Sequence, residues 1–410
     1  MSRGFALLAA MLLAIGGALT AGAAEAAEAA KAPAQTETVA MRRVMVMLRL
    51  GAEHYRAGGD YGGAYGDAMG EKARLRLARR IAREHGLRVI EAWPMPKLGI
   101  DCVVMEIRDG RSSASVAAEL TKLPGVSWSQ PLNEFRMQSA APAYNDRLAA
   151  AQPWRLASLH KLTTGKGETI AIIDSRIDTS HPDLAGQIAT LRDFAAPGRA
   201  VPERHGTGVA GIIGARAGNG VGIAGVAPGA RILGLRACWE QPYGGPTVCD
   251  TLSLAKALMF AIENRAGVIN LSLTGPQDRL LEGLIGLGLA RGATIVAAVD
   301  GDNPRNSFPA FVAGVVPVSA ARLSVGEPPV YIAPGLDVPT TEPEGKWSVV
   351  SGSSFAAAHV SGLAALLRQL SRSGRSAAPG LLLGPRGEID VCTLVGRTAR
   401  RDVAACEMGR

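Results

Sequence analysis

Residues 168–174 read ETIAIID, a run of apolar residues that follows Glu168 and ends at Asp174. Strands buried on both faces have this near-continuous apolar pattern, which is typical of a parallel sheet covered by helices. Similar runs follow at 230–237, 267–273, 294–299 and 315–320. Helix-like segments are found at 207–214, 252–262, 279–291 and 354–370. This alternation predicts an α/β fold with a doubly wound, mainly parallel sheet and helices on both faces.

The residues before this pattern indicate a smaller unit over 43–135. The expected elements are, in order, strand 44–50, helix 71–84, strands 89–94 and 100–107, helix 113–123 and strand 126–130. This β-α-β-β-α-β order predicts a small α+β domain with a ferredoxin-like fold. Residues 136–152 have the composition of a linker. We therefore place the larger domain at 153–372 and a Gly- and Pro-rich tail at 373–410.

The N-terminus has the pattern of an export signal. Arg3 supplies a positive charge, residues 5–19 are apolar, and small Ala residues follow. We therefore expect a signal peptide at 1–27, a flexible segment at 28–42, and export to the periplasm or the medium. The alternative is an uncleaved signal, which would be the only contact of the protein with a membrane, because no later run is long and apolar enough to span a bilayer.

The composition is that of a folded protein of 410 residues, with 47% hydrophobic and 20% charged residues. The formal net charge is +8, and basic residues are densest over 72–83. There, Lys and Arg alternate with Ala, Leu and Ile in a helix-like pattern, without interleaved aromatic residues or a nucleic-acid-binding motif. We interpret this stretch as a solvated helix face and expect no nucleic-acid partner.

The five cysteines are spaced in a way that suggests disulfides. Two sequence-close pairs, Cys238 with Cys249 and Cys392 with Cys406, can each close a short loop, and export permits such bridges to form. Cys102 is left over. No Cys or His spacing indicates a zinc site, so we expect no metal bound by thiolates.

Three polar residues lie where a doubly wound sheet gathers its reactive groups, at strand ends and helix starts. Asp174 ends an apolar run, His205 opens a helix-like stretch, and Ser354 opens the long helix at 354–370. A serine needs an adjacent base to become a nucleophile, and a histidine can take its proton and return it to a leaving amine. A buried aspartate fixes the imidazole tautomer. Together they predict acyl transfer.

The strings around these residues resemble the three active-site blocks of subtilisin-like serine peptidases. They read AIIDSRIDTSHPDL (171–184), HGTGVAGIIGA (205–215) and GSSFAAAHVSG (352–362), supported by GIAGVAPGARILGLRA (222–237) and VINLSLTGP (268–276). The resemblance covers about residues 153–372 and implies an endopeptidase that cleaves polypeptides, with Asp174, His205 and Ser354 as its triad. It further implies that Ser272, Leu273, Thr274 and Gly275 bind the substrate backbone and help wall its pockets.

The same resemblance gives the smaller unit a role. Exported enzymes of this family often carry a ferredoxin-like propeptide that assists folding and inhibits until it is cleaved, and residues 43–135 look like such a partner within the chain. The alternative is an accessory domain that stays attached. We expect no required cofactor, and the sequence does not indicate a structural calcium ion.

Two places depart from the family pattern. Arg176 stands where the first block usually has glycine, so its side chain must point to solvent or alter the local turn. The family's oxyanion-hole Asn occurs in strings such as VAAAGN, whereas this chain reads VAAVDGDNP from Val296. Gly301 aligns with that Asn without a gap, Asp300 aligns after a one-residue shift, and Asn303 lies two positions late.

The missing Asn leaves two interpretations. In subtilisin, loss of this donor costs about 10²–10³ in kcat. We expect a slower peptidase, because the triad residues and the Ser354 N–H remain. The alternative is a catalytically weakened pseudoenzyme that binds polypeptides. Thr274 also replaces a family glycine, which is expected to narrow a pocket, and His181 and His359 are interpreted as structural.

Overall fold

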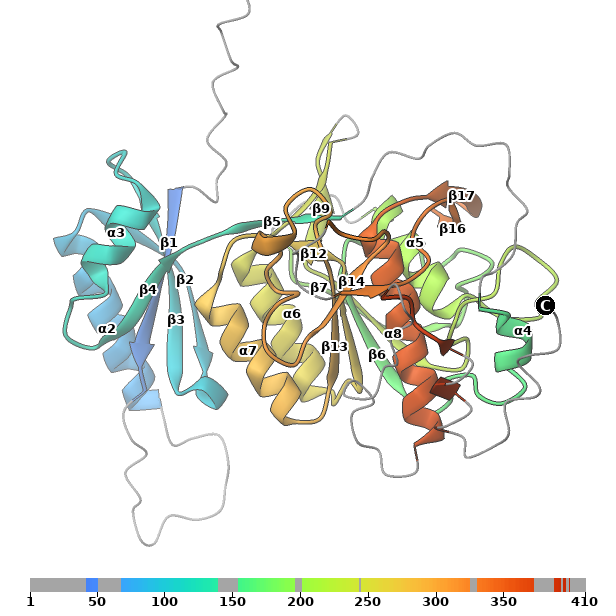
Figure 1. The fold of residues 1–410 in the computed structure, drawn as a ribbon. Helices are drawn as coiled ribbons and strands as arrows, with labels where there is room; N and C mark the ends of the chain where they lie inside the picture. The colour runs from blue at the N-terminus through green and yellow to red at the C-terminus, as the bar shows by residue number, and fades with distance from the viewer. Residues whose placement is uncertain are drawn as a thin grey trace, which may run out of the picture.

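The computed structural model (Figure 1) describes residues 42–50, 68–138, 154–195, 201–242, 245–324, 330–371, 387–391, 394, 395 and 398. The expected signal peptide, residues 28–41, most of the expected linker and most of the tail lie outside these ranges, as do Cys392 and Cys406. Among the helices that are described, none has the length and apolar character needed to cross a membrane.

The N-terminal unit is a four-stranded antiparallel sheet with two helices (Figure 1). Its elements are β1 (Arg43–Arg49), α2 (Ala68–Glu84), β2 (Leu87–Met95), η2 (Pro96–Leu98), β3 (Ile100–Ile107), α3 (Ser113–Leu120) and β4 (Val126–Pro131). The strand order is β2-β3-β1-β4. Chain order and sheet order together are those of the ferredoxin-like fold that the sequence predicted.

Both faces of this small sheet are buried. In β1, Val44 and Val46 belong to a hydrophobic cluster with residues of α2 and α3. The intervening Met45 and Met47 belong to the cluster that contains the core of the larger unit. Because side chains alternate along a strand, β1 presents one face to its own helices and the other to the rest of the protein. The free cysteine, Cys102, is buried in this second cluster.

The larger unit is built on a seven-stranded sheet in which every pairing is parallel. In sheet order, the strands are β15 (Tyr331–Ile332), β14 (Val316–Ser319), β13 (Thr294–Ala298), β11 (Val268–Leu271), β6 (Thr169–Asp174), β8 (Arg231–Arg236) and β7 (Ile188–Asp193). The prediction of a doubly wound parallel sheet is confirmed. The edge strand β7 and the short β15 were not predicted.

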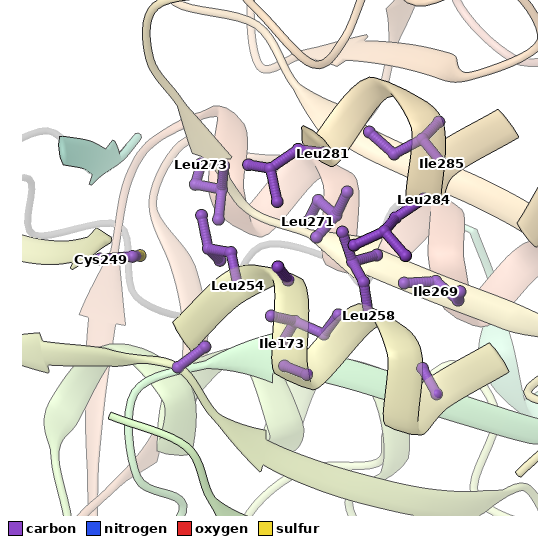
Figure 2. Packing of buried hydrophobic residues seen from close by; sticks show 14 of the residues in the cluster. Ile173, Cys249, Leu254, Leu258, Ile269, Leu271, Leu273, Leu281, Leu284 and Ile285 are labelled. Atoms are coloured by element: carbon purple, nitrogen blue, oxygen red, sulfur yellow. The ribbon is translucent and has the colours of Figure 1, made fainter. Parts of the chain in front are cut away.

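Helices cover both faces of this sheet. In β6, Ala171 and Ile173 share a cluster with α6 (Thr251–Glu263) and α7 (Arg279–Ala290), part of which is seen in Figure 2. Ile170 and Ile172 face the opposite way, toward α5 (Arg204–Gly214) and α8 (Ser353–Leu370). The short helix α4 (Leu156–Leu159) also joins this second cluster. The continuous apolar run in β6 therefore reflects burial on both faces.

A second small sheet joins the two units. Its order is β12 (Leu273–Thr274), β5 (Glu134–Met137), β10 (Thr247–Asp250) and β9 (Cys238–Glu240). The sequence placed residues from 136 onward in a linker, and this was wrong for Arg136 and Met137. They continue β5, because this strand finds two antiparallel partners in the larger unit. In Figure 1, the chain runs from β4 directly across into β5.

The disulfide prediction is confirmed for one pair. Cys238 and Cys249 are directly opposite each other in the β9–β10 pairing and form a disulfide. The bridge therefore fastens the β9–β10 hairpin, in which β10 pairs with β5 and β9 is the edge strand. A further hairpin that was not predicted, β16 (Val338–Glu342) with β17 (Lys346–Val350), packs on α5: the hydroxyls of Thr340 and Thr341 donate to backbone oxygens of that helix.

Candidate active site

Asp174 lies at the carboxyl end of β6, fully buried. Its Oδ1 accepts hydrogen bonds from the backbone N–H of Ser175 at 2.6 Å and from Nδ1 of His205 at 2.8 Å. This contact requires α5 to approach the end of β6 closely. Gly206 permits the approach, because a Cβ there would overlap the carbonyl oxygen of Ser175.

His205 is the second residue of α5 and is 6% exposed. Its Nδ1 donates to Asp174, which leaves Nε2 as the proton acceptor of the neutral ring. Nε2 is buried and has no hydrogen-bond partner among the described residues. The imidazole ring lies 5.4 Å from the ring of Phe355, the residue after Ser354. The structure thus brings the candidate base to the start of α8.

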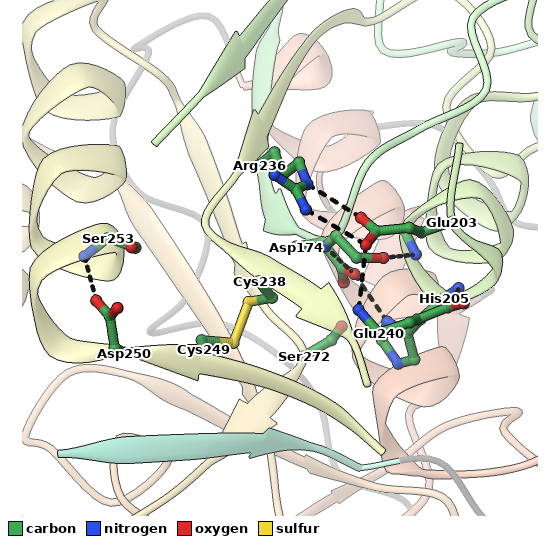
Figure 3. Close-up of a disulfide and its surroundings, with 12 residues drawn as sticks. Asp174, Glu203, His205, Arg236, Cys238, Glu240, Cys249, Asp250, Ser253 and Ser272 are labelled. Atoms are coloured by element: carbon green, nitrogen blue, oxygen red, sulfur yellow. Dashed lines mark hydrogen bonds and ion pairs between the residues drawn. A yellow bond between two sulfur atoms is a disulfide. The ribbon is translucent and has the colours of Figure 1, made fainter. Parts of the chain in front are cut away.

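A buried ion pair supports the start of α5 (Figure 3). Glu203, the residue before α5, accepts a hydrogen bond from Nε of Arg236 at 3.1 Å. Burial lowers the pKa of Arg236, but its hydrogen bond and attraction to Glu203 outweigh burial and raise the pKa overall. Glu240 completes the support, since its carboxylate accepts from the backbone N–H of His205 at 3.1 Å. Sequence reasoning missed these three residues.

Arg176, which replaces the family glycine, is accommodated by the same network. Its backbone N–H donates to Glu203 at 2.6 Å, and its guanidinium lies 3.6 Å from the carboxylate of Asp193. Its backbone does not adopt a positive φ, so no glycine is needed here. The two expectations were a side chain that points to solvent or an altered local turn. The Arg176 side chain is partly buried and lies beside the Asp193 carboxylate.

Ser354 is fully buried at the second position of α8. Gly352, the N-cap of this helix, has φ of 140°, a conformation that glycine adopts without strain. The Ser354 hydroxyl donates to the carbonyl oxygen of Ser272 at 2.7 Å. It accepts from the backbone N–H of Gln138 at 3.0 Å. No hydrogen bond joins Ser354 to His205, because the hydroxyl is turned toward Ser272 and Nε2 of His205 is unpartnered.

Gln138 follows β5 and lies directly at the candidate nucleophile. Its carbonyl oxygen accepts from the backbone N–H of Ser354 at 3.0 Å, and its own N–H also approaches Ser272 O at 3.3 Å. The sequence did not single out Gln138. No local signal marked it, since it lies 216 positions before Ser354.

The expected substrate-binding residues contact this same segment. Leu273 pairs with Met137 and Thr274 with Arg136 in an antiparallel ladder. Next to the ladder, a Cβ at Gly275 would overlap the ring of the buried Phe135, so this glycine makes room for the ring. Residues 134–138 thus occupy the edge of β12 as an added strand.

Asp300 organises the loop that was expected to form the oxyanion region. Its carboxylate accepts from the backbone N–H groups of Asp302, at 2.9 Å, and Asn303, at 3.3 Å, while its own N–H donates to Ser307. The Asn303 side chain accepts from Asn306 at 3.1 Å. Gly301 faces open space and does not adopt a positive φ. Among the described residues, the Gln138 carbonyl accepts a hydrogen bond from the backbone N–H of Ser354.

The two other histidines near the site are held by backbone groups, as their structural interpretation expects. Nδ1 of His359 hydrogen-bonds to the carbonyl of Phe355, and burial lowers the pKa of this imidazole to about 4. Nε2 of His181 hydrogen-bonds to the carbonyl of Lys346. Within the described part of the chain, no three His, Cys, Asp or Glu residues form a cluster suited to a metal ion.

A comparison with protein families identifies the larger unit. The model of the subtilase family matches residues 165–378, more than half of the chain. This chain belongs to the subtilase family. Thermitase from Thermoactinomyces vulgaris is 31% identical over 240 residues, which cover 55% of this subtilase and 82% of thermitase. A thermophilic serine proteinase from Bacillus sp. (strain AK1) is 36% identical over 219 residues, or 50% of this chain.

Solved structures extend the likeness to the N-terminal unit. Fervidolysin from Fervidobacterium pennivorans, described as a keratinolytic enzyme related to subtilisin, aligns with 87% of this subtilase at a TM-score of 0.60 and 19% identity, which shows a shared fold. The prenylagaramide maturation protease PagA aligns with 60% of the chain, with a TM-score of 0.51 and 25% identity. This subtilase spans 53% of the Bacillus proteinase and 61% of fervidolysin.

Proposed function

We propose that this subtilase is a serine endopeptidase in which Asp174, His205 and Ser354 cleave peptide bonds through an acyl-enzyme. The observation that supports it most is the position of Gln138. Its backbone carbonyl accepts a hydrogen bond from the N–H of Ser354, and its own N–H donates to the Ser354 hydroxyl, the candidate nucleophile. Membership of the family and the 2.8 Å bond from His205 to Asp174 support the same proposal.

The reaction follows from these positions. Oγ of Ser354 forms a bond to the substrate carbonyl carbon while its proton passes to Nε2 of His205. The Ser354 N–H, which donates to the Gln138 carbonyl in this structure, stabilises the oxyanion. The C–N bond then breaks, and His205 gives its proton to the leaving amine. Water attacks the acyl-enzyme in the same way and restores the Ser354 hydroxyl. Asp174 holds the His205 tautomer throughout.

One rearrangement must precede attack. The Ser354 hydroxyl donates to Ser272 and has to turn toward Nε2 of His205 before it can lose its proton to that nitrogen. A rotation about one side-chain bond changes the partner of the hydroxyl without moving α8. The buried, unpartnered Nε2 favours this change, since a buried acceptor without a hydrogen bond is costly.

We propose further that the first substrate is the chain itself, cleaved between Gln138 and Ser139, and that the N-terminal unit acts as an inhibitor or folding aid until it leaves. Residues 134–138 pair with β12 and β10 as a bound substrate strand would, and they block this edge to other polypeptides. The expected window for this cleavage, from about Arg136 to Ala151, lies mostly outside the described residues.

The test uses the full chain and its Ser354→Ala variant. A fluorophosphonate probe should label the wild type and leave Ser354→Ala unlabelled, and a mature chain that begins at Ser139 should appear by mass spectrometry in the wild type alone. Normal casein cleavage by folded Ser354→Ala would contradict the assignment of the nucleophile. A folded wild type that neither labels nor cleaves would instead be the polypeptide-binding pseudoenzyme.

We also propose that the protein is exported and needs no cofactor. The signal-like residues 1–27 and the Cys238–Cys249 disulfide support export, because such bridges persist in oxidising compartments. Cell fractionation of the full chain and of a variant with charged residues within 5–19 tests the first point. Activity that survives dialysis against a chelator tests the second.

A further inference from the structure

We propose that Thr274 makes this subtilase select glutamine at the substrate position that precedes the cleaved bond, an inference that rests on the proposed function. The residue at that position is Gln138, and its side-chain amide nitrogen donates to the hydroxyl oxygen of Thr274 at 2.6 Å. The substrate class is therefore polypeptides with Gln before the scissile bond.

The main-chain contacts of the segment cannot supply this selectivity. The Gln138 N–H and carbonyl contact Ser354 and Ser272 through atoms that every residue except proline possesses. Among the described residues, the side chain of Gln138 donates a hydrogen bond to Thr274. We therefore assign recognition of the residue type to the Thr274 hydroxyl.

Thr274 is suited to this task by its burial. With residues 134–138 in place the residue is 6% exposed, and it lies in the short strand β12. Its neighbour Gly275 is anchored by a backbone hydrogen bond from its N–H to Phe308 at 3.0 Å. A buried hydroxyl on a rigid strand favours a substrate that donates to it, and it disfavours an apolar side chain of similar length, such as methionine, which leaves the oxygen without that donor.

A glycine at position 274 could not form this bond. Thr274 was expected to narrow a pocket by its size, and its hydroxyl also accepts a hydrogen bond from the Gln138 amide. Serine carries the same hydroxyl as threonine and is the conservative replacement that keeps this acceptor.

The first experiment requires no turnover. In the full-length Ser354→Ala protein, a double-mutant cycle combines Gln138→Met with Thr274→Val, and amide hydrogen exchange of residues 134–138 reports how firmly the segment is docked. We expect Gln138→Met to speed exchange about tenfold with Thr274 present and less than twofold in the Thr274→Val background. Thr274→Ser keeps the hydroxyl and should behave like the wild type. Equal effects of Gln138→Met in both backgrounds would overturn the proposal.

The second experiment measures selectivity in the processed protein. Two peptides, NEFRMQSA and NEFRMMSA, take their sequence from residues 133–140 and differ only at the position of Gln138. We expect kcat/KM to favour the Gln peptide about tenfold, with the ratio retained in Thr274→Ser and close to one in Thr274→Val. Equal cleavage of both peptides by the wild type would refute selection by Thr274 while leaving the peptidase proposal intact. Cleavage of neither peptide would contradict the proposed function, and the double-mutant cycle would still decide whether Thr274 reads the side chain.

Discussion

The substitution Gly301→Asn should make this subtilase faster. Among the described residues, the carbonyl of Gln138 accepts one backbone hydrogen bond, from the Ser354 N–H at 3.0 Å, and Gly301 aligns with the Asn that supplies a further donor in the family. Gly301 has open space around the position of a Cβ and does not adopt a positive φ, so the site accepts a side chain without strain. The single substitution is preferred because Asp300 holds the loop through the N–H groups of Asp302 and Asn303.

The size of the gain can be bounded. One oxyanion donor is worth about 2.7–4 kcal/mol, and fixing the new side chain costs about 1 kcal/mol of rotamer entropy. The remainder of about 1.7–3 kcal/mol corresponds to about 20- to 150-fold in kcat. KM should change little, since the new bond forms mainly as negative charge develops on the oxygen.

Initial rates on a chromogenic peptide with Gln before the scissile bond supply the measurement, made on processed protein of known active-site concentration. Gly301→Asp is the matched control, because its side chain has the shape of Asn but lacks the N–H donors, and it should not accelerate the reaction. If folded Gly301→Asn has the kcat of the wild type, another group already serves the oxyanion and the reasoning fails.

Three further predictions concern stability. Arg236→Met should lower the free energy of unfolding by about 3 kcal/mol in urea titrations, because it leaves Glu203 buried without its cation. Arg231→Met, at the exposed start of the same strand, is the control and should change this free energy by less than about 0.5 kcal/mol. Replacing both Cys238 and Cys249 by Ser should cost about 2–3 kcal/mol, since the bridge closes a loop with a sequence separation of 11, and reductant should have no further effect on that variant. Burial lowers the pKa of His359 to about 4, so the unfolded chain binds more protons than the folded one between about pH 4 and 6.5. The free energy of unfolding should therefore rise with pH across this window, by up to about 3 kcal/mol. His359→Gln should flatten this profile.

The fold was largely predictable because its strands are buried on both faces. The run in β6 was predicted at its observed bounds, and the observed β3 coincides with the predicted strand 100–107. The elements that were missed have weaker signals. β7 lies at an edge with several exposed residues, and β9, β10 and β12 have two to four residues each. Such short strands are determined by their partners in the sheet, which a periodicity argument along one segment cannot identify.

The positions of the three proposed reacting groups were also predictable, because each lies at the start or end of a regular element and carries a recognisable string. The residues that support them were not predictable, since Glu203 precedes α5 and contacts Arg236 and Glu240, which lie 33 and 37 positions later in the sequence. The position of residues 134–138 in the site depends on contacts between residues that are still further apart in the sequence. Its register sets Met137 opposite Leu273, and a slip of one residue would turn every side chain of β5 to the other face and move Gln138 away from Thr274. Two neighbouring strands and the buried Phe135 against Gly275 fix that register together. The residue that meets Thr274 is therefore determined by the tertiary fold, and no motif along the chain identifies it.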